Sequence, residues 1–447
     1  MCGFIVTNIT NPNLFEANRF VGLRGPDGTN IETHDGVTFL HDLLSITGKI
    51  TTQPFHDKEF VSLFNGEIYN FRDFGDLESD GQCLIPAFRK FGIEFVNQLD
   101  GEFAIVLLDR KKNSLLLFAD VFGTKPIHYG TRGREIAVGS YPSAVRALGF
   151  ENVFRLKANS MMEFNLDTGR MQQKDSLFRF DLEQHKTHFD DWRNAFSSAI
   201  RKRSENTREQ IFIGLSSGYD SGAISLELTT QNVNFKSFSI YGIEDHAVMD
   251  QRIKIIAQHA ETDILESNDL DIAWARGHIQ QDIEPVQFDI FSTGTGHVER
   301  PYLYEDGGAL GLTLICRSAK AEGRKIYISG QGADEIMADY GHGGKRFYRH
   351  SNFGGLFPED LKEIFPWASF YGSSQASYLA KEEYVAGSFG IETRYPFLDK
   401  HVVQEFLSLS HLVKNSHYKA PLRHYLGNKQ FPTSFDKKIG FVPMRSR

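Results

Sequence analysis

The pattern of apolar residues changes near residue 180, and this change limits the folds open to the chain. Before it, short β-rich runs such as Phe103–Leu108 alternate with Gly and Asp turns, which predicts packed antiparallel sheets. After it, strand-like runs alternate with helical patterns, beginning with Asp190–Arg203, which predicts a parallel sheet with helices on its faces. We therefore expect an α+β domain over residues 1–178, a polar linker over 179–190 and an α/β domain over 191–447.

Within the second region, three short apolar runs have the length of buried strands. They are Gln210–Leu215, Ser237–Tyr241 and Lys325–Ser329. A helical pattern over Met249–Ala260 separates the second run from the third.

Composition narrows the classes of function. The chain has 447 residues, enough for more than one core, and its formal net charge of −8 gives no general attraction to nucleic acid or to an anionic membrane. The start lacks a signal-peptide pattern, and no apolar stretch approaches the roughly 20 residues of a spanning helix. Cys2, Cys83 and Cys316 are too scattered for a disulfide framework or a zinc site, which fits a reducing cytoplasm.

Cys2 follows the first methionine directly. Removal of Met1 would give one residue both a thiol and a free α-amine, so the sulfur can attack a carbonyl while the amine takes up the proton. A cysteine taken alone is more often an inert buried residue, so this interpretation depends on the motifs that follow.

Three polar clusters follow Cys2 along the first region. Arg24-Gly25-Pro26-Asp27-Gly28 is a turn-forming sequence, and Asp80 offers a carboxylate that can hold an ammonium group. Asn65-Gly66 follows an apolar run, and such a pair at a strand end can direct a side-chain amide and a backbone N–H toward one point. An oxyanion hole requires that geometry.

In this order, the motifs resemble those of the class II, N-terminal-nucleophile glutamine amidotransferases, and specifically the glutamine-hydrolysing asparagine synthetase family. The resemblance implies an αββα sandwich in which Cys2 attacks the side-chain amide of glutamine and releases ammonia. It also implies that Asn65 and Gly66 stabilise the oxyanion. The residues that match the family's glutamine-binding set are Arg24, Glu67 and Asp80.

One position departs from this pattern. The segment His41–Ile46 carries Leu43 where the family has an arginine that clamps the glutamine α-carboxylate. An arginine grips a carboxylate through two charge-assisted hydrogen bonds, and leucine can make neither. Three interpretations stay open: another cation fills the gap, glutamine binds weakly, or free ammonia is the nitrogen source.

The strongest motif of the second region begins where its first strand ends, at Leu215-Ser216-Ser217-Gly218-Tyr219-Asp220-Ser221-Gly222. A small-residue loop leading into a helix leaves backbone N–H groups free beside the positive end of the helix dipole, which suits phosphate. The serine hydroxyls add donors, and Asp220 can reach a Mg²⁺ that bridges phosphates. The motif resembles the pyrophosphate loop of adenylating enzymes; an ordinary Ser/Gly turn is the alternative.

A second element, Ser329-Gly330-Gln331-Gly332-Ala333-Asp334-Glu335, also follows a strand. In the asparagine synthetase family the matching segment lines the nucleotide site, so the resemblance implies that Asp220 and Asp334 form the metal pair. The middle position is often Glu and is assigned to the amidation step. Here it is Gln331, which cannot accept a proton, so proton removal rests on water or on another group.

Three further segments match the family in order. Gly390–Asp399 resembles a signature helix and turn, and Lys419-Ala420-Pro421-Leu422-Arg423 matches a segment whose lysine contacts phosphates and the adenylated intermediate. Lys438-Ile439-Gly440-Phe441 resembles the final lysine motif. A solvated surface charge is the usual state of a lysine, and position in the motif order favours a function for Lys419 more than for Lys438.

The resemblance spans nearly the whole chain and implies a two-domain glutamine-dependent amidotransferase. It implies that ATP and Mg²⁺ serve to adenylate a carboxylate, by default aspartate, and that ammonia then gives asparagine, AMP and pyrophosphate. Two alternatives stay open: a ligase of the same family that uses another carboxylate or another amine, and a non-catalytic binding or regulatory protein. A homodimer is one assembly that the sequence allows.

Overall fold

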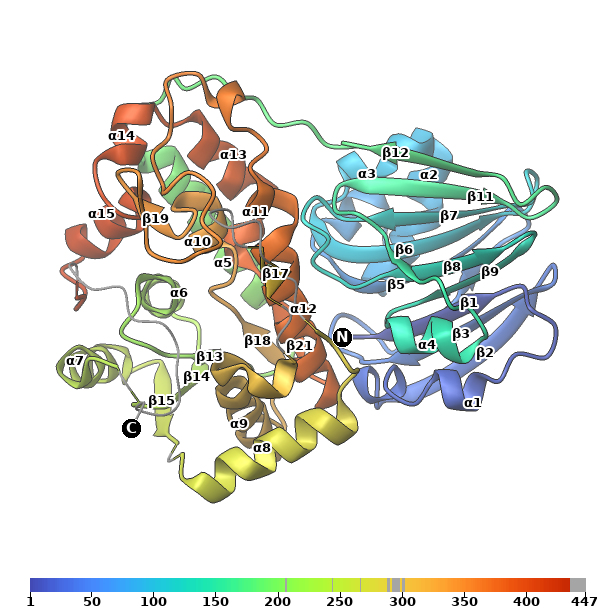
Figure 1. The fold of residues 1–447 in the computed structure, drawn as a ribbon, viewed down its shortest axis with the longest axis horizontal. Coiled ribbons are helices and arrows are strands. Elements are labelled where there is room, and N and C mark those ends of the chain that lie inside the picture. The colour runs from blue at the N-terminus through green and yellow to red at the C-terminus, as the bar shows by residue number, and fades with distance from the viewer. Residues whose placement is uncertain are drawn as a thin grey trace.

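The computed structural model describes residues 1–205, 207–242, 244–265, 267–287, 290–291, 298–299 and 302–434. The chain forms two halves, and its N-terminus lies between them (Figure 1). The first half is a sandwich of two antiparallel sheets, and the second is built on a parallel sheet, as the sequence pattern predicts.

Two six-stranded sheets pack face to face in the first half. The strand order is β10-β8-β9-β1-β3-β2 in one sheet and β12-β11-β7-β6-β5-β4 in the other. Helices α1 and α4 cover the outer face of the first sheet, and α2 and α3 cover the outer face of the second. This is the expected αββα sandwich.

The strands of the first sheet are β1 (Gly3–Thr7), β2 (Gly28–His34), β3 (Val37–Leu43), β8 (His128–Arg132), β9 (Glu135–Gly139) and β10 (Phe154–Arg155). Those of the second are β4 (Phe55–His56), β5 (Phe60–Ile68), β6 (Gly101–Asp109), β7 (Ser114–Ala119), β11 (Ser160–Asn165) and β12 (Met171–Asp175). The helices are α1 (Leu14–Ala17), α2 (Leu84–Phe91), α3 (Phe95–Gln98) and α4 (Pro142–Ala147).

Strand β6 shows why this sheet needs cover on both faces. Successive side chains of a strand point to opposite faces. Ala104 and Val106 enter the core between the two sheets, whereas Phe103 and Ile105 pack under the helices on the outer face. A strand that is apolar on both faces is stable only when both are covered, and the sandwich provides this.

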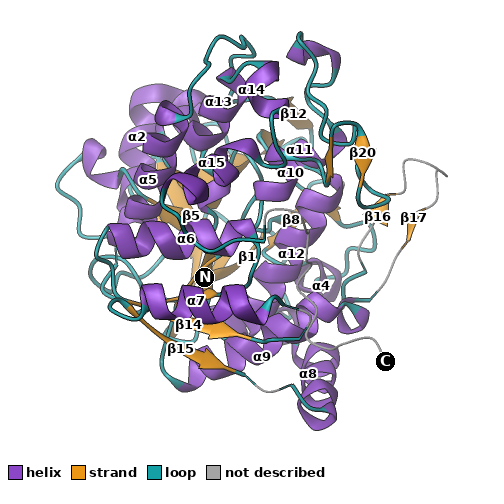
Figure 2. Ribbon diagram, turned by 90° about the vertical axis from the view of Figure 1, so that its left-hand side faces the viewer, coloured by secondary structure: helices purple, strands orange, loops and turns teal. Residues whose placement is uncertain are grey.

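The second half contains a five-stranded parallel sheet of order β15-β14-β13-β18-β21. Successive side chains of β13 again point to opposite faces of the sheet. Ile211 and Ile213 join the core on one face, and Phe212 joins the core on the other. Helices α6 and α7 contribute to the first core, and α8 and α9 contribute to the second. Figure 2 views this half from the side on which α6, α7 and α15 lie.

The strands of this sheet are β13 (Ile211–Gly214), β14 (Phe235–Ser239), β15 (Ala260–Ile264), β18 (Ile326–Ile328) and β21 (Glu392–Arg394). Two small hairpins pair β16 (Ile290–Phe291) with β17 (Val298–Glu299) and β19 (Gly341–His342) with β20 (Lys345–Arg346). The helices are α5 (Asp190–Glu205), α6 (Tyr219–Thr230), α7 (His246–Ile256), α8 (Asp269–Asp282), α9 (Gly307–Ala321), α10 (Ala333–Met337), α11 (Ala368–Tyr371), α12 (Ser373–Ser388), α13 (Lys400–Ser408), α14 (His411–Asn415) and α15 (Ala420–Asn428).

The segment Gly390–Asp399 differs from the expected helix and turn. It contains strand β21 followed by a single 3-10 turn over Pro396–Leu398. Residues of β21 pair with β18 at the edge of the parallel sheet, so sheet pairing decides the local structure. Between β12 and α5 the chain crosses from one half to the other. Along this crossing, the described residues form one isolated parallel β-bridge, between Lys186 and Leu409.

Candidate active sites

Cys2 lies immediately before β1, buried where the two halves meet. The Leu44 backbone N–H donates to its Sγ at 3.4 Å, which holds the sulfur against β3. Burial raises the pKa of the Cys2 thiol to about 11. Burial also lowers the pKa of the neighbouring Met1 α-amine to about 5, so the surroundings favour the uncharged form of an amine at this place.

Asn65 and Gly66 lie inside β5, which corrects their expected place at a strand end. Strand pairing continues through them because Gly66 adopts a φ of 137° and brings the Glu102 carbonyl oxygen within 1.9 Å of where a Cβ would stand. Among the described residues, neither polar atom of the buried Asn65 amide has a hydrogen-bond partner. An unpaired buried amide is costly, so this one is available for a ligand.

The two carboxylates predicted to bind glutamine lie in the same buried pocket. The Asp80 side chain accepts from the Ile68 N–H at 3.0 Å, and Glu67 accepts from the Thr47 hydroxyl at 2.6 Å. Burial raises the pKa of Asp80 to about 7, and burial together with the nearby Asp80 charge raises the pKa of Glu67. A buried carboxylate such as Asp80 is stabilised in its charged form by a nearby cation, and an ammonium group can supply that charge.

Arg24 is fully buried and holds the Cys2 backbone in place. Its Nε donates to the Cys2 carbonyl at 2.9 Å, and its guanidinium pairs with Glu383 of α12 at 3.0 Å. The predicted contact of Arg24 with glutamine stays a prediction. Leu43 packs against the core of the second half, so its side chain takes an apolar role at the position where the family has an arginine.

The second half supplies charged groups to this pocket that the sequence motifs did not assign to it. Arg394 of β21 pairs with Glu67 at 3.1 Å and with Glu392 at 2.7 Å. Glu392 also lies 3.9 Å from the Met1 amine. The Gly390–Asp399 motif identified this segment, but its contact with the first half depends on tertiary packing.

More buried ion pairs continue along the domain interface. Glu102 of β6 pairs with Arg203 of α5 at 2.8 Å, and Lys125 pairs with Glu383 at 3.0 Å. Arg203 also pairs with Asp399 at 3.0 Å. Buried charges of this kind are tolerated only when each has its partner, so the two halves fit in one relative position.

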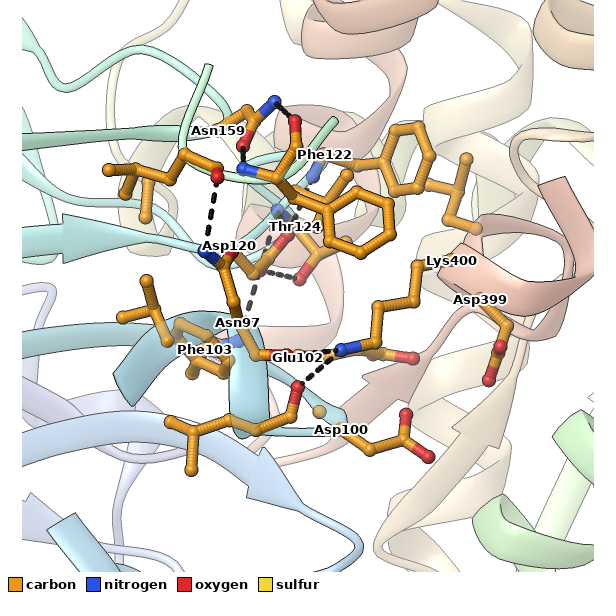
Figure 3. A pocket seen from close by; sticks show the side chains of 18 of the residues that line it. Asn97, Asp100, Glu102, Phe103, Asp120, Phe122, Thr124, Asn159, Asp399 and Lys400 are labelled. Atoms are coloured by element: carbon orange, nitrogen blue, oxygen red, sulfur yellow. Dashed lines mark hydrogen bonds between the residues drawn. The ribbon is translucent and has the colours of Figure 1, made fainter. Parts of the chain in front are cut away.

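A small cavity at the same interface is visible in Figure 3, where Lys400 donates to the carbonyls of Asn97 and Leu99. Its volume of about 30 Å³ has room for ordered water and not for a substrate. We therefore place no reaction there.

The second candidate site lies at the carboxyl ends of β13 and β18. The Lys419 ammonium is 2.7 Å from each carboxylate oxygen of Asp220 and 3.0 Å from Asp334. Although burial opposes the charge, Asp220 and Asp334 raise the pKa of Lys419. Three segments far apart in the sequence, each carrying one of the motifs named above, thus meet at one point.

Backbone geometry permits this convergence at two positions. A Cβ on Gly330 would lie 2.8 Å from the Cβ of Asp220, so glycine lets the two loops approach. Lys419 has a φ of 46°, a left-handed conformation that is uncommon for a residue other than glycine. Strained backbone of this kind is concentrated at functional sites.

The serine loop leads into α6 as predicted, and most of its polar groups bond within the protein. The Ser216 N–H donates to the Ser221 hydroxyl at 3.0 Å, and the Gly218 N–H donates to the Ser216 hydroxyl at 3.2 Å. The Ser217 N–H and hydroxyl both donate to Glu244. The N-cap residue of α6 is Gly218, which has no side chain to cap the helix, and the positive end of the helix dipole lies beside Asp220 in the first turn.

Arg252 of α7 holds this loop through its backbone carbonyls. The sequence pattern predicted a helix here but did not predict this contact. Its guanidinium donates to the carbonyls of Ser216 and Gly218. The close fit requires Gly222, because a Cβ there would lie 2.7 Å from the guanidinium. Leu215, at the start of the loop, is buried in the core.

The remaining predicted residues lie beside this site or outside the described chain. The Ser329 N–H donates to the Arg394 carbonyl at 3.0 Å, and its hydroxyl accepts from the Gln331 N–H at 3.0 Å. The Gln331 side chain lies beside the buried Glu335 carboxylate. Lys438 lies outside the described residues.

Among the described residues, no helix combines the length and apolar character needed to cross a membrane.

Comparison with known families identifies both halves. Residues 1–189 match the glutamine amidotransferase domain family, and residues 191–381 match the asparagine synthase family. The chain therefore joins an amidotransferase domain to an amide-forming synthase domain. It belongs to the asparagine synthetase family.

Several curated relatives cover most of the chain. The glutamine-hydrolysing asparagine synthetase B of Escherichia coli is 25% identical over 406 residues, which cover 86% of this chain and 70% of the relative. The glutamine-hydrolysing asparagine synthetase 2 of Oryza sativa is 24% identical over 429 residues, covering 90% and 68%. A solved glutamine phosphoribosylpyrophosphate amidotransferase from B. subtilis shares 14% identity with a TM-score of 0.33 over 48% of this chain and 60% of its own.

Proposed function

We propose that this protein is a glutamine-dependent carbon–nitrogen ligase that converts a carboxylate, by default aspartate, into its amide at the cost of ATP. The family assignment supports the reaction class. The observation that carries the proposal is the meeting of Asp220, Asp334 and Lys419 at the carboxyl edge of the parallel sheet. Ligands of open parallel sheets bind at this edge.

In the proposed adenylation, the substrate carboxylate attacks the α-phosphorus of ATP and pyrophosphate leaves. Lys419 would stabilise the charge that develops on the leaving group, because a buried ammonium acts strongly in a low-dielectric site. The N-terminus of α6, which begins after Gly218, adds positive potential on the same side.

Asp220 and Asp334 would hold Mg²⁺, which neutralises phosphate charge when bound. The two carboxylates are suited to a cation because both already pair with the Lys419 ammonium from different loops. The site therefore accommodates a positive charge between them. Oxygen ligands of this kind are those that Mg²⁺ prefers.

In the proposed glutaminase reaction, the Cys2 sulfur forms a bond to the glutamine amide carbon, and the carbon–nitrogen bond breaks to release ammonia. Water then hydrolyses the thioester. The unpaired Asn65 amide would bind the oxyanion, and Asp80 and Glu67 would hold the α-ammonium group. This assignment takes Cys2 as the first residue after Met1 is removed.

Two assays test the proposal. ATP–pyrophosphate exchange with a panel of carboxylic acids reports adenylation, and ammonia release from glutamine reports the Cys2 site. We expect exchange with aspartate and glutaminase activity in the same preparation. Absence of exchange with every acid, together with absence of glutaminase activity, would support the non-catalytic alternative.

The apolar packing of Leu43 favours one variant of this function, a same-family ligase that draws mainly on free ammonia or another amine. The amide yield with ammonium chloride compared with glutamine distinguishes the two nitrogen sources. A cytoplasmic setting and a homodimeric state belong to the proposal as well.

A further inference from the structure

Gln331 leaves the proposed amidation without a proton acceptor at the position where the family often has Glu. Attack of ammonia on the acyl-adenylate forms a carbon–nitrogen bond and breaks the bond from carbon to the AMP oxygen. The nitrogen must lose one proton to become a neutral amide. A general base at that step contributes typically about 10²–10⁴-fold to the rate.

Two carboxylates lie near Gln331. Glu335 contacts the Gln331 side chain and already accepts from the Tyr340 hydroxyl, whereas Glu382 on α12 reaches the Gln331 backbone through Ser329. It shares a hydrogen bond with Ser329, and the Ser329 hydroxyl in turn accepts from the Gln331 N–H at 3.0 Å. The carboxylate is therefore one hydrogen-bonded residue away from the position that Gln331 occupies. The Ser329–Glu335 segment also carries Asp334, so the same loop connects Glu382 to the nucleotide site.

The hydrogen-bonding capacity of the Glu382 carboxylate is only partly used by the described residues. Its Oε2 atom is buried and has no hydrogen-bond partner within the described part of the chain, while the residue as a whole stays partly accessible. A buried carboxylate oxygen without a donor is costly unless a ligand supplies one. An attacking ammonia, which carries N–H donors, meets this need.

The charged and titratable groups around Glu382 come from four elements and one loop. Its own helix contributes Lys381 and Glu383, and the neighbouring groups are Glu335 of α10, Tyr327 of β18, Cys316 of α9 and Tyr395 after β21. Burial, Glu383 and Glu335 raise the pKa of Glu382 to about 7, whereas Ser329 and Lys381 oppose the shift. A base with a pKa near the working pH can both accept and release a proton.

We infer that Glu382 accepts the proton from ammonia as it attacks the acyl-adenylate, in the role that Gln331 cannot perform. The inference rests on the proposed function and assigns one catalytic step within it. The proton moves from nitrogen to Oε2 as the carbon–nitrogen bond forms, and it passes to solvent after AMP leaves. Gln331 stays a neutral hydrogen-bonding neighbour of the reacting nitrogen.

The test separates adenylation from amidation in the full chain. ATP–pyrophosphate exchange with aspartate requires no proton acceptor for ammonia, whereas amide formation from ammonium chloride requires one and bypasses Cys2. We expect Glu382→Gln to keep exchange within about threefold of the unmodified protein and to lower amide formation by about 100-fold or more. Glu359→Gln, on the exposed surface, serves as the matched control.

Two further measurements distinguish a proton acceptor from a structural residue. With the rate expressed per concentration of neutral ammonia, the unmodified protein should gain activity as pH rises through 7 and then level off, and Glu382→Gln should lose this dependence. Adding Gln331→Glu to Glu382→Gln should restore amide formation at least tenfold. An equal loss of exchange and amidation, or amidation kept within threefold, would overturn the inference.

A failure of the proposed function gives a different result. If the unmodified protein shows no exchange with any acid, the ligase function falls, and the inference falls with it. If the unmodified protein makes amide and Glu382→Gln does so equally well, only the role of Glu382 is rejected.

Discussion

The two candidate sites differ in how they are assembled. The site around Asp220, Asp334 and Lys419 belongs to one domain, at the edge of a single parallel sheet. The Cys2 site needs both domains, because Glu67 and Arg24 of the first half take their partners Arg394 and Glu383 from the second. The glutaminase chemistry therefore depends on domain contact in a way that adenylation does not.

The two sites also differ in how their charged groups are balanced. At the synthetase site, one ammonium already balances two carboxylates, which are partly accessible to solvent. At the Cys2 site, Arg394 already pairs with Glu67, but Asp80 has no ion-pair partner among the described residues and burial raises its pKa to about 7. Adenylation thus has a preformed charge arrangement, whereas the glutaminase pocket is completed by its substrate.

The largest effect that separates the two sites is expected from Cys2→Ala. Glutamine-dependent amide formation should fall by more than about 10³-fold, because the nucleophile is lost. Amide formation from ammonium chloride should stay within about twofold, since the second site does not use this thiol. Cys83→Ala is the control for the loss of a buried thiol that is not the nucleophile. Unchanged glutamine-dependent synthesis in Cys2→Ala would contradict the assignment.

Lys419→Ala tests the other side of the comparison. Removing a preorganised charge of this kind typically costs about 10²–10³-fold in rate, so ATP–pyrophosphate exchange should fall by that factor. Glutamine hydrolysis should persist. Lys429→Ala removes an exposed lysine at the other end of α15 and should leave both activities intact. Equal losses of glutaminase and exchange activity would show that the two sites are not separable.

Arg394→Met tests the dependence of the Cys2 site on domain contact. Breaking a buried ion pair by removing one partner typically costs about 3–5 kcal/mol, so denaturant unfolding should report a loss of that size. Glutaminase activity should fall with it. Arg132→Met removes an exposed pair with Glu135 and should cost about 0.2–1 kcal/mol. Similar losses in the two variants would remove the distinction between interface and surface pairs.

The pH dependence of glutamine binding gives a smaller effect. Because the pKa of Asp80 is raised to about 7, this carboxyl is neutral below pH 7 and charged above it. A charged Asp80 is needed to hold an ammonium group, so KM for glutamine should rise up to about tenfold for each pH unit below 7. Asp80→Asn should remove the dependence, whereas Asp76→Asn, on the exposed surface, should keep it. A KM that is flat over this range in the unmodified protein would reject the role.

The same shift fixes the sign of the stability effect at Asp80. Its folded-state pKa lies above the value of about 4 for an unfolded aspartate, so the folded state binds more protons between pH 4 and 7. The contribution of Asp80 to the free energy of unfolding therefore falls as pH rises through this window.

Leu43→Arg gives the smallest expected change and resolves the three interpretations of this position. An added guanidinium that reaches the glutamine carboxylate should lower KM for glutamine by about tenfold, the equivalent of one charge-assisted hydrogen bond. Ammonia-dependent synthesis should not change. Leu43→Met is the control for altered packing. A KM unchanged in Leu43→Arg would indicate that another group already binds the carboxylate.

Local patterns predicted much of the fold and the synthetase site. The runs around Ile211–Gly214 and Ile326–Ile328 have the length and apolar character of buried strands, and both are strands in the structure. Because both strands run in parallel, the loops that follow them meet at one edge, which brings Asp220 to Asp334.

The Cys2 site shows what local patterns omit. Asn65-Gly66 looks like a strand end, but pairing with β6 carries the strand through the positive φ of Gly66. The contacts of Arg394 with Glu67 and of Arg252 with the serine loop join residues far apart in the sequence. No periodicity records such contacts, since they arise only when finished elements pack together.

Strand β21 is only three residues long, yet it serves both sites. Glu392 faces the Met1 amine, the Arg394 side chain pairs with Glu67, and the Arg394 carbonyl accepts from the Ser329 N–H. A domain exchange between members of this family would therefore have to move β21 together with the amidotransferase surface that it touches. The boundary at which the two activities can be recombined lies inside the second domain, and a cut at the linker alone would leave both halves with mismatched charges.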